Sequence, residues 1–365
     1  MMKKKAVRII AIVLAVIIAA GGITAYALLP HSLSYDIDSV KRVGSGIELL
    51  KSTDDEVLIK ESNPEFKVML FTDLHLDGKN STSNVTIGNL VDNIVKEKPD
   101  LVILGGDMVT SAFNRKRANQ LAEIFEKLGV YWAGVLGNHE GDNKFSISRE
   151  EMVDIFSSYD HCLMRKGNDD VWGVCNYSLT VLLDNHKIRH TYFFMDTGDE
   201  MSAEDIKKYG LDPNDSYTDG VKESQVKWYV EKNEKIKREL GDFKSTVVVH
   251  IPLPQYEKAA EGEKFLYGGK LENICESAFD SGLFDAIKKC GTTETVFCGH
   301  DHLNTFGAEY DGVLLSYIQP SGYGSYTTAS KLGYEEKDWL QGYTVLDIHE
   351  DGTFDAKRVR NSEAE

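Results

Sequence analysis

From residue 67 onward, short apolar strands alternate with amphipathic helices, and this alternation constrains the fold more than any other feature of the chain. Apolar runs at residues 67–71, 101–104 and 131–136 predict three strands. Between them, apolar residues recur at helical spacing over 87–95 and 121–128, with Pro99 and Gly129 as the helix stops. A β-α-β-α-β order predicts a parallel sheet with helices packed over it.

The second half of the chain continues the same mixture less regularly. Further strands are expected at residues 177–183, 191–195, 246–249, 295–298, 313–318 and 343–348, with a helix at 225–236. The stretch 254–271 is polar and irregular, so we expect a loop or small cap there. The residues alone predict an α/β domain with mixed strands.

Five short polar groups each follow a predicted strand directly. Ligands of open α/β folds gather beyond the carboxyl ends of the strands, so this placement is informative. The groups are Asp73-Leu74-His75, Gly106-Asp107, Gly137-Asn138-His139-Glu140, His250, and Gly299-His300-Asp301-His302.

Each group alone has an ordinary structural explanation. Asp107 or Asn138 could cap a turn or helix, and a single histidine such as His250 is more often a satisfied core residue. Together the groups are far harder to explain by chance, because they contain five of the ten histidines. Their carboxylate, imidazole and amide donors, with no thiolate, suit zinc, iron or manganese.

At this point the chain resembles the calcineurin-like metallophosphoesterase family, whose ordered motifs are D-x-H, G-D-x, G-N-H-[DE], a lone H and G-H-x-H. All five motifs are present. The stretches 250–254, 281–284 and 299–304 are similar to the branch related to purple acid phosphatases. Met108 follows Asp107 directly and no tyrosine matches the second motif, which disfavours an iron(III)–tyrosinate centre.

The resemblance implies a four-layer α/β/β/α sandwich with mixed sheets and two divalent or trivalent metal ions, with Mn, Zn and Fe as the candidates. It implies that Asp107 bridges the two metals. The other implied ligands are Asp73, His75 and His302 for one metal, and Asn138, His250 and His300 for the other.

The implied reaction is hydrolysis of a phosphate ester (monoester, diester or pyrophosphate link) by a hydroxide that bridges the metals. His139 stands next to a ligand and is the expected catalytic donor to the leaving oxygen, with Glu140 or Asp77 as candidates to orient it. The alternative function is that of a non-catalytic surface or binding protein that retains the fold. Loops at 142–170, 200–224 and 254–271 are expected to set specificity, and residues 322–326 either line the pocket or form an ordinary turn.

The N-terminus predicts a membrane segment. Lys3, Lys4, Lys5 and Arg8 precede an uncharged, mostly aliphatic run at residues 9–29, long enough to span a bilayer. The basic flank predicts a cytoplasmic N-terminus and an exported remainder. Ala25-Tyr26-Ala27 also fits a signal-peptide cleavage site, in which case the protein is secreted. We expect three parts in the chain. Residues 1–29 form a membrane anchor or signal peptide, residues 30–64 form a tether with short strands, and residues 65–358 form the catalytic domain, which lies outside the cytoplasm.

The formal net charge is −17, and without the four basic residues before residue 9 about −21 remains on the rest. Such a balance opposes binding to nucleic-acid polymers, so we expect a phosphorylated small molecule or cell-surface substrate as the partner. The chain has five cysteines, of which Cys162 and Cys175 could close a short loop in an oxidising compartment, whereas Cys298 is expected to be a small buried residue.

Overall fold

Two mixed β-sheets form the centre of the protein. The computed structural model describes residues 35–61, 63, 65–78, 80–141, 145–262 and 264–363. The larger sheet has eight strands in the order β1-β2-β6-β7-β8-β9-β11-β10, and the smaller has five in the order β13-β12-β3-β4-β5. The strands of the larger sheet are β1 (Glu48–Ser52), β2 (Glu56–Lys60), β6 (Tyr177–Leu182), β7 (Ile188–Phe194), β8 (Ser245–Val248), β9 (Thr293–Cys298), β10 (Gly307–Tyr310) and β11 (Val313–Tyr317). Those of the smaller sheet are β3 (Phe66–Phe71), β4 (Leu101–Leu104), β5 (Tyr131–Gly134), β12 (Gly342–Ile348) and β13 (Phe354–Arg360).

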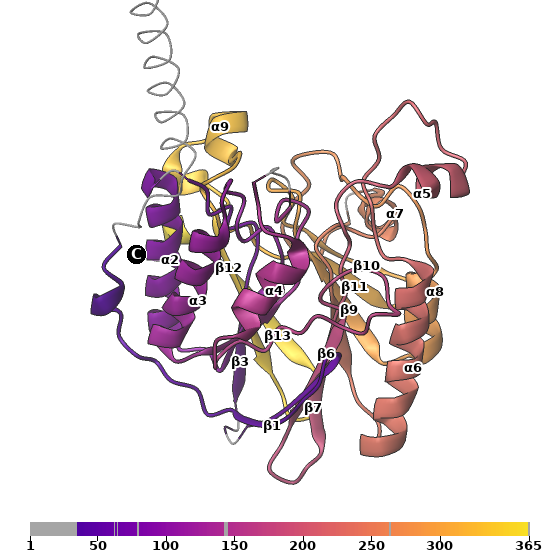
Figure 1. Ribbon diagram of the computed structural model, residues 1–365, viewed down its shortest axis with the longest axis horizontal. Helices are drawn as coiled ribbons and strands as arrows, with labels where there is room; N and C mark the ends of the chain where they lie inside the picture. Colours follow the sequence, from indigo (N-terminus) through magenta and orange to yellow (C-terminus); the bar gives the residue numbers. More distant parts are fainter. Residues whose placement is uncertain are drawn as a thin grey trace, which may run out of the picture.

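Helices cover the outer faces of both sheets, which gives the expected four-layer α/β/β/α arrangement. Figure 1 shows α2, α3 and α4 on one side of the molecule and α6 and α8 on the other. Shorter helices α5, α7 and α9 follow β7, β8 and β11, and all three lie toward the upper end of the molecule in Figure 1, with α9 on the side of α2 and α5 on the side of α8. The helices are α2 (Asn80–Glu97), α3 (Arg115–Leu128), α4 (Arg149–Ser157), α5 (Ala203–Lys208), α6 (Glu223–Leu240), α7 (Gln255–Ala260), α8 (Leu283–Cys290) and α9 (Thr328–Leu332).

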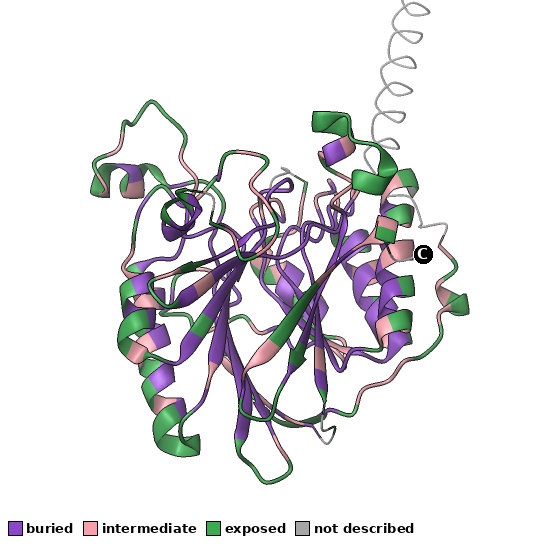
Figure 2. Cartoon of the chain, turned by 180° about the vertical axis from the view of Figure 1, so that it is seen from behind, coloured by how far each residue is buried: buried purple, intermediate pink, exposed green. Residues whose placement is uncertain are grey.

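Strand periodicity divides the interior into two apolar clusters. Along β7, Tyr192 and Phe194 face the layer between the sheets, whereas Phe193 faces α6 on the outside. The sheets touch directly where Phe297 of β9 meets Phe354 of β13, with ring centroids 6.3 Å apart. Apart from β1 and much of β13, the strands are accordingly buried along most of their length, while the outer helix faces are exposed (Figure 2).

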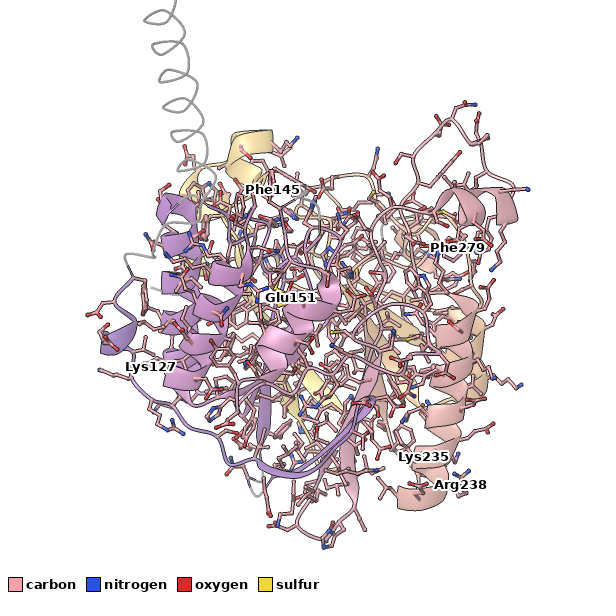
Figure 3. The ribbon with its side chains drawn as sticks, in the orientation of Figure 1. Lys127, Phe145, Glu151, Lys235, Arg238 and Phe279 are labelled. Atoms are coloured by element: carbon pink, nitrogen blue, oxygen red, sulfur yellow. The ribbon has the colours of Figure 1, made fainter. Side chains whose placement is uncertain are left out.

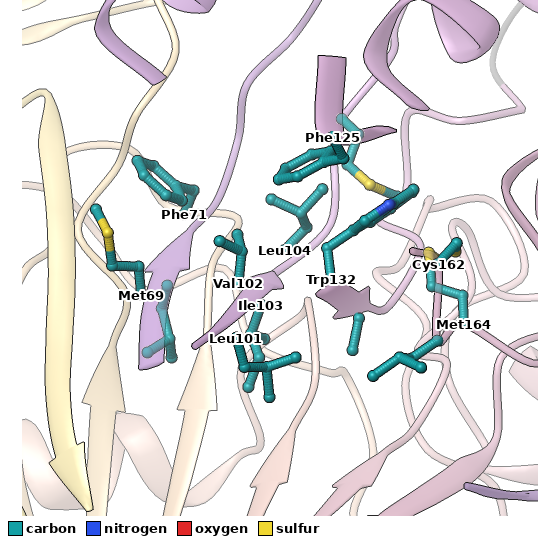
Figure 4. Close-up of a cluster of buried hydrophobic side chains, with 14 of the residues drawn as sticks. Met69, Phe71, Leu101, Val102, Ile103, Leu104, Phe125, Trp132, Cys162 and Met164 are labelled. Atoms are coloured by element: carbon teal, nitrogen blue, oxygen red, sulfur yellow. The ribbon is translucent and has the colours of Figure 1, made fainter. Parts of the chain in front are cut away.

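The parallel strands β3, β4 and β5 lie beneath α2 and α3, as the β-α-β-α-β pattern predicts. Register pairs Phe71 with Leu104 and Leu104 with Gly134 at the carboxyl ends of these strands. In Figure 4, Phe125 of α3 lies beside Trp132 of β5, and their rings stack with centroids 4.9 Å apart. The carboxyl ends of these three strands therefore lie side by side, and the loops that carry the site residues begin there.

The predicted strands and long helices are present with boundaries that differ by a few residues. Residues 254–271, expected as a loop or small cap, contain the short helix α7. β1 and β2 belong to the larger sheet, since β2 pairs in parallel with β6. All five cysteines are free thiols, and Cys162, Cys175 and Cys298 are buried.

The predicted membrane segment at residues 9–29 lies outside the described residues. Across the part of the chain that the structure describes, no helix combines the length and apolar character needed to cross a bilayer.

Candidate metal centre

The residues of all five motifs converge at one edge of the two sheets. Asp73 and His75 follow β3, Asp107 follows β4, and Asn138 and His139 follow β5 of the smaller sheet. From the larger sheet, His250 follows β8, and His300 and His302 follow β9. A bridge between Thr72 and Pro320 joins the two sheets at this edge. The architecture therefore brings together residues as far apart in sequence as 73 and 302.

Four of these residues form a compact donor cluster. One ligand atom from each of Asp73, His75, Asp107 and His302 lies within 4.8 Å of all the others, and all four residues are buried. The Nε2 atoms of His75 and His302 are 3.0 Å apart, and His302 Nε2 is 3.3 Å from Asp73 Oδ1. Two imidazole nitrogens pointing at one spot, beside two carboxylates, suit a shared cation.

The remaining predicted ligands form a second group beside Asp107. His250 Nε2 is 3.4 Å from Asp107 Oδ2 and 3.0 Å from the side-chain oxygen of Asn138. The ring of His300 lies 5.3 Å from that of His250, centroid to centroid. His250 Nδ1 is 2.8 Å from the carbonyl oxygen of Gly105, which directs Nε2 toward Asp107. Asp107 Oδ2 thus lies close to both donor groups.

The backbone is held in an uncommon conformation at four of these positions. Asp73, His75, Asp107 and His300 have φ values of 55°, 44°, 51° and 77°. Hydrogen bonds between the loops maintain this geometry, for example from the His75 amide to the Asp107 carbonyl at 2.9 Å. Left-handed conformations of residues other than glycine cost energy and concentrate at functional sites. Nothing in the sequence reveals this strain.

Close loop packing explains two of the motif glycines. Gly106 has φ 101°, and a Cβ there would lie only 2.4 Å from Nδ1 of His250. A Cβ on Gly137 would collide with the Asp107 carboxylate. Glycine is therefore required for the two loops to approach the donors this closely.

The histidines of the site differ in charge at neutral pH, and a metal ion bound by His250 would displace its proton. Burial lowers the pKa of His75 to about 4 and that of His300 to about 3. Both imidazoles are therefore neutral at neutral pH, which is the form that binds a metal ion. Burial opposes protonation of His250, but the neighbouring Asp107 raises its pKa to about 10. Asp107 Oδ2 is buried and accepts no hydrogen bond from any described residue, although His75 and His250 Nε2 each lie 3.4 Å away. A buried carboxylate oxygen that lies between imidazoles and lacks a hydrogen bond has the surroundings expected of a metal ligand.

His139 lies at the rim of the cluster, with its side chain 42% exposed and Nε2 4.0 Å from Asp107 Oδ2. Its amide donates to Asp107 Oδ1 at 2.9 Å, which fixes its backbone. The carboxylate of Glu140, one candidate to orient the ring, instead accepts from the amides of Met108, Val109 and Gly137. The other candidate, Asp77, accepts from Thr82 and Ser83.

Two functional neighbours were not singled out as ligand supports in the sequence. Tyr326, inside the 322–326 stretch, stacks on His302 with centroids 4.2 Å apart, and its carbonyl oxygen lies 3.0 Å from His302 Nδ1. Its hydroxyl donates to Glu272, which also accepts from the Leu303 amide. Neither Tyr326 nor Glu272 belongs to one of the five motifs, because both lie in loops that are distant in sequence from the ligands.

A cleft of about 590 Å³ opens beside the centre. Asn138, His139 and His300 of the predicted site line it. One of the three expected specificity loops, residues 200–224, also lines it, together with the residue before that loop and Cys275. The described lining residues are Asn138, His139, Asp199, Glu200, Ser216, Tyr217, Thr218, Cys275 and His300.

Comparison with known proteins agrees with this geometry. The calcineurin-like phosphoesterase family profile matches residues 66–304, more than half of the chain and all five motifs. Among solved structures, a dimetal phosphatase from Danio rerio superposes with a TM-score of 0.52 at 15% identity, covering 82% of this chain and 98% of that one. At that identity the likeness concerns the fold.

Two relatives from Arabidopsis thaliana carry names from the purple acid phosphatases. "Probable inactive purple acid phosphatase 14" is 28% identical over 289 residues, 72% of this chain and 66% of the relative. "Probable inactive purple acid phosphatase 29" is 26% identical over 312 residues, 75% of this chain and 76% of the relative. The match to the first thus spans just under two thirds of its length.

Proposed function

Because the chain belongs to the calcineurin-like phosphoesterase family, we propose that it hydrolyses phosphate esters at a centre of two metal ions. The observation that carries the proposal is the buried convergence of Asp73, His75, Asp107 and His302 within 4.8 Å. The residues fit such a centre, because the oxygen and imidazole donors are those of zinc, iron and manganese sites.

Asp73, His75 and His302 would hold one metal, and Asn138, His250 and His300 the other. Asp107 would contact both, since its Oδ2 is equally distant from Nε2 of His75 and of His250, at 3.4 Å. When bound, a metal pair lowers the pKa of water and neutralises charge on a phosphoryl group.

The residues around the metals would orient the substrate and move its proton. His139 faces the cleft without being enclosed by the ligands, so its imidazole can donate a proton to the leaving oxygen. Asp107 is 1% exposed and Asp73 2%, which keeps bulk water from screening these charges. The strained loops place the donors before substrate arrives, which limits the reorganisation needed for reaction.

The names of the Arabidopsis relatives favour a second candidate function, a non-catalytic binding protein that keeps the fold. The purified chain, loaded in turn with Mn, Zn, Fe and Co, should be assayed against aryl monoesters, aryl diesters and nucleotides. Turnover that requires a metal supports the phosphoesterase. Stoichiometric metal binding without turnover of any substrate supports the binding protein.

We further propose that the catalytic domain lies outside the cytoplasm, held by the N-terminal segment or released after its cleavage. The support is the basic flank before the apolar run at residues 9–29. A C-terminal tag should be digested by protease added to intact cells, or to spheroplasts if there is an outer membrane. Protection of the tag would contradict this location, and release of the tagged domain would indicate cleavage.

A further inference from the structure

An ion pair between Arg149 and Asp196 connects the two halves of the molecule close to the second group of predicted ligands. Arg149 is the first residue of α4, the helix on which Figure 3 labels Glu151, and Asp196 follows β7 of the larger sheet. The guanidinium Nη2 donates to Asp196 Oδ1, and the two side chains are 18% and 2% exposed. Neither residue belongs to one of the five motifs.

Arg149 also holds the loop that carries Asn138. Its Nη1 donates to the carbonyl oxygen of Gly137, the residue directly before Asn138. The amide of Gly137 donates in turn to Glu140 Oε2 at 2.6 Å. Side chains therefore bind both polar backbone groups of Gly137, and this fixes the peptide bond from which Asn138 begins.

Asp196 is itself fixed by hydrogen bonds within the layer of the larger sheet. Its Oδ2 accepts from the Val174 amide at 2.7 Å, and its Oδ1 also accepts from the Gly198 amide at 3.0 Å. Its own amide donates to Asn176 Oδ1 at 3.1 Å. Asp196 therefore offers Arg149 an acceptor whose position is determined by the surrounding backbone.

The next residue, Thr197, holds the loop that carries His250. Its hydroxyl is buried and accepts from the amide of Ile251 at 3.1 Å, and Ile251 follows His250 directly. The side chains of His250 and Asn138 meet, with Nε2 and Oδ1 3.0 Å apart. Two adjacent residues after β7 are thus bonded, directly or through Arg149, to the loops of two ligands of the same predicted metal site.

We propose that Arg149, Asp196 and Thr197 are positioning residues for the metal site to which Asn138 and His250 belong. They act through the backbone of the two ligand loops, whose side chains must converge for a metal ion to bind. The inference rests on the proposed two-metal centre and adds that one of its two sites has a support of its own.

The other predicted metal site is supported by different contacts. His302 Nδ1 lies 3.0 Å from the carbonyl oxygen of Tyr326, and Asp73 Oδ2 accepts from the Thr72 hydroxyl at 2.8 Å. These contacts are made by segments other than α4 and the residues after β7. Changes at the Arg149–Asp196 pair should therefore weaken one metal site much more than the other.

The test is calorimetric titration of the full chain with Zn²⁺ and, separately, with Mn²⁺. The double variant R149M/D196N removes both charges together, because removal of one alone would leave the other uncompensated and destabilise the fold. Thr197→Val removes the hydroxyl and keeps the shape of the side chain. We expect two metal equivalents in the wild type. In each variant one of them should bind about 10–100-fold more weakly, the usual cost of changing a residue that supports a ligand.

Combination with changes to the ligands identifies the affected site. Added to His75→Ala, which removes a ligand of the other site, R149M/D196N should leave no tightly bound metal. Added to His250→Ala, it should cause little further loss, because both changes act on one site. In R149M/D196N alone, kcat should recover as the metal concentration is raised, which a general loss of stability would not produce.

The matched control is E61Q/R189M, which removes another buried pair, with Arg189 Nε 2.7 Å from Glu61 Oε1 near the amino end of β7. It should retain both metals at wild-type affinity. Unchanged metal binding in R149M/D196N, equal weakening of both equivalents, or the same selective loss in the control would overturn the inference. Two tightly bound metals in the wild type without turnover of any ester would instead overturn the proposed function, and the metal titrations would still decide the inference.

Discussion

Asp107 lies equally close to His75 and His250, one histidine from each donor group of the centre. We predict that Asp107→Asn lowers metal affinity at both sites and turnover by at least about 100-fold. Changes to residues that only support a ligand already cost about 10–100-fold in metal affinity. Metal analysis and kcat measure the two effects, with Asp92→Asn on the exposed face of α2 as the control. Two full metal equivalents in Asp107→Ala would refute the bridging role.

His139 contributes through its position at the rim of the cleft. His139→Ala should retain two metals and the fold yet lose on the order of 10²–10⁴-fold in kcat for alkyl esters, the usual contribution of general acid catalysis. The loss should be smaller for nitrophenyl esters, because nitrophenolate departs without a proton. The exposed His349→Ala serves as the control. Equal losses for both ester types, with metals retained, would exclude His139 as the acid.

Among the structural elements, the loops after β4 and β5 are joined by Glu140. Its two carboxylate oxygens accept from Met108 and Val109 on one loop and from Gly137 on the other, the last at 2.6 Å. In Glu140→Gln one oxygen becomes an NH₂ group that cannot accept, so a buried amide loses its partner at a cost of about 1–3 kcal/mol. We predict a lower melting temperature together with weaker metal binding.

The matched control for this prediction is Glu123→Gln, which makes the same change on the exposed surface of α3. Thermal unfolding and metal titration of the two variants separate loop linkage from a general loss of charge. If Glu140→Gln binds metal as the wild type does, then Glu140 stabilises the fold without positioning the ligand loops.

The elements show how far the sequence determines this architecture. Local apolar periodicity was enough to predict β3, β4 and β5 with their intervening helices, because these strands pair with near neighbours in the chain. It could not predict that β12 pairs with β3, nor that β2 joins β6, since those partners are set by packing across the molecule. The short amphipathic helix α8 was also missed, although its glycine boundaries, Gly282 and Gly291, are visible.

The site shows the same difference between local sequence patterns, which could be predicted, and contacts between distant segments, which could not. The motif residues were predicted by type and order, and the structure brings them together. The loop at 200–224 and the stretch 322–326 were predicted only as whole segments, and the contacts of Tyr326 and Glu272 beside His302 were not predicted, because they form between loops distant in sequence. Glu140 and Asp77 were both candidates to orient His139, and the carboxylate of Glu140 accepts from loop amides, a contact that the sequence does not reveal.

At the scale of the whole molecule, the buried histidine of β7 couples stability to pH independently of the metal centre. His190 is fully buried, with Nδ1 2.9 Å from the Gly352 carbonyl and Nε2 2.9 Å from the Thr246 hydroxyl. Burial lowers its pKa to about 4, and the charge of Lys244 acts in the same direction. In the unfolded chain a histidine has a pKa of about 6.5.

Below pH 6.5 the His190 side chain therefore binds a proton in the unfolded chain but not in the folded protein. The stability that His190 contributes is complete above about pH 6.5 and is lost as the pH falls toward 4, by about 3 kcal/mol in total. His190→Gln removes this titration while retaining a polar side chain. We predict that the stability difference between wild type and variant shrinks by about that amount between pH 7 and pH 4, measured by urea unfolding with the metals removed from both proteins. A difference that stays constant across this range would show that His190 is protonated equally in the folded and unfolded states.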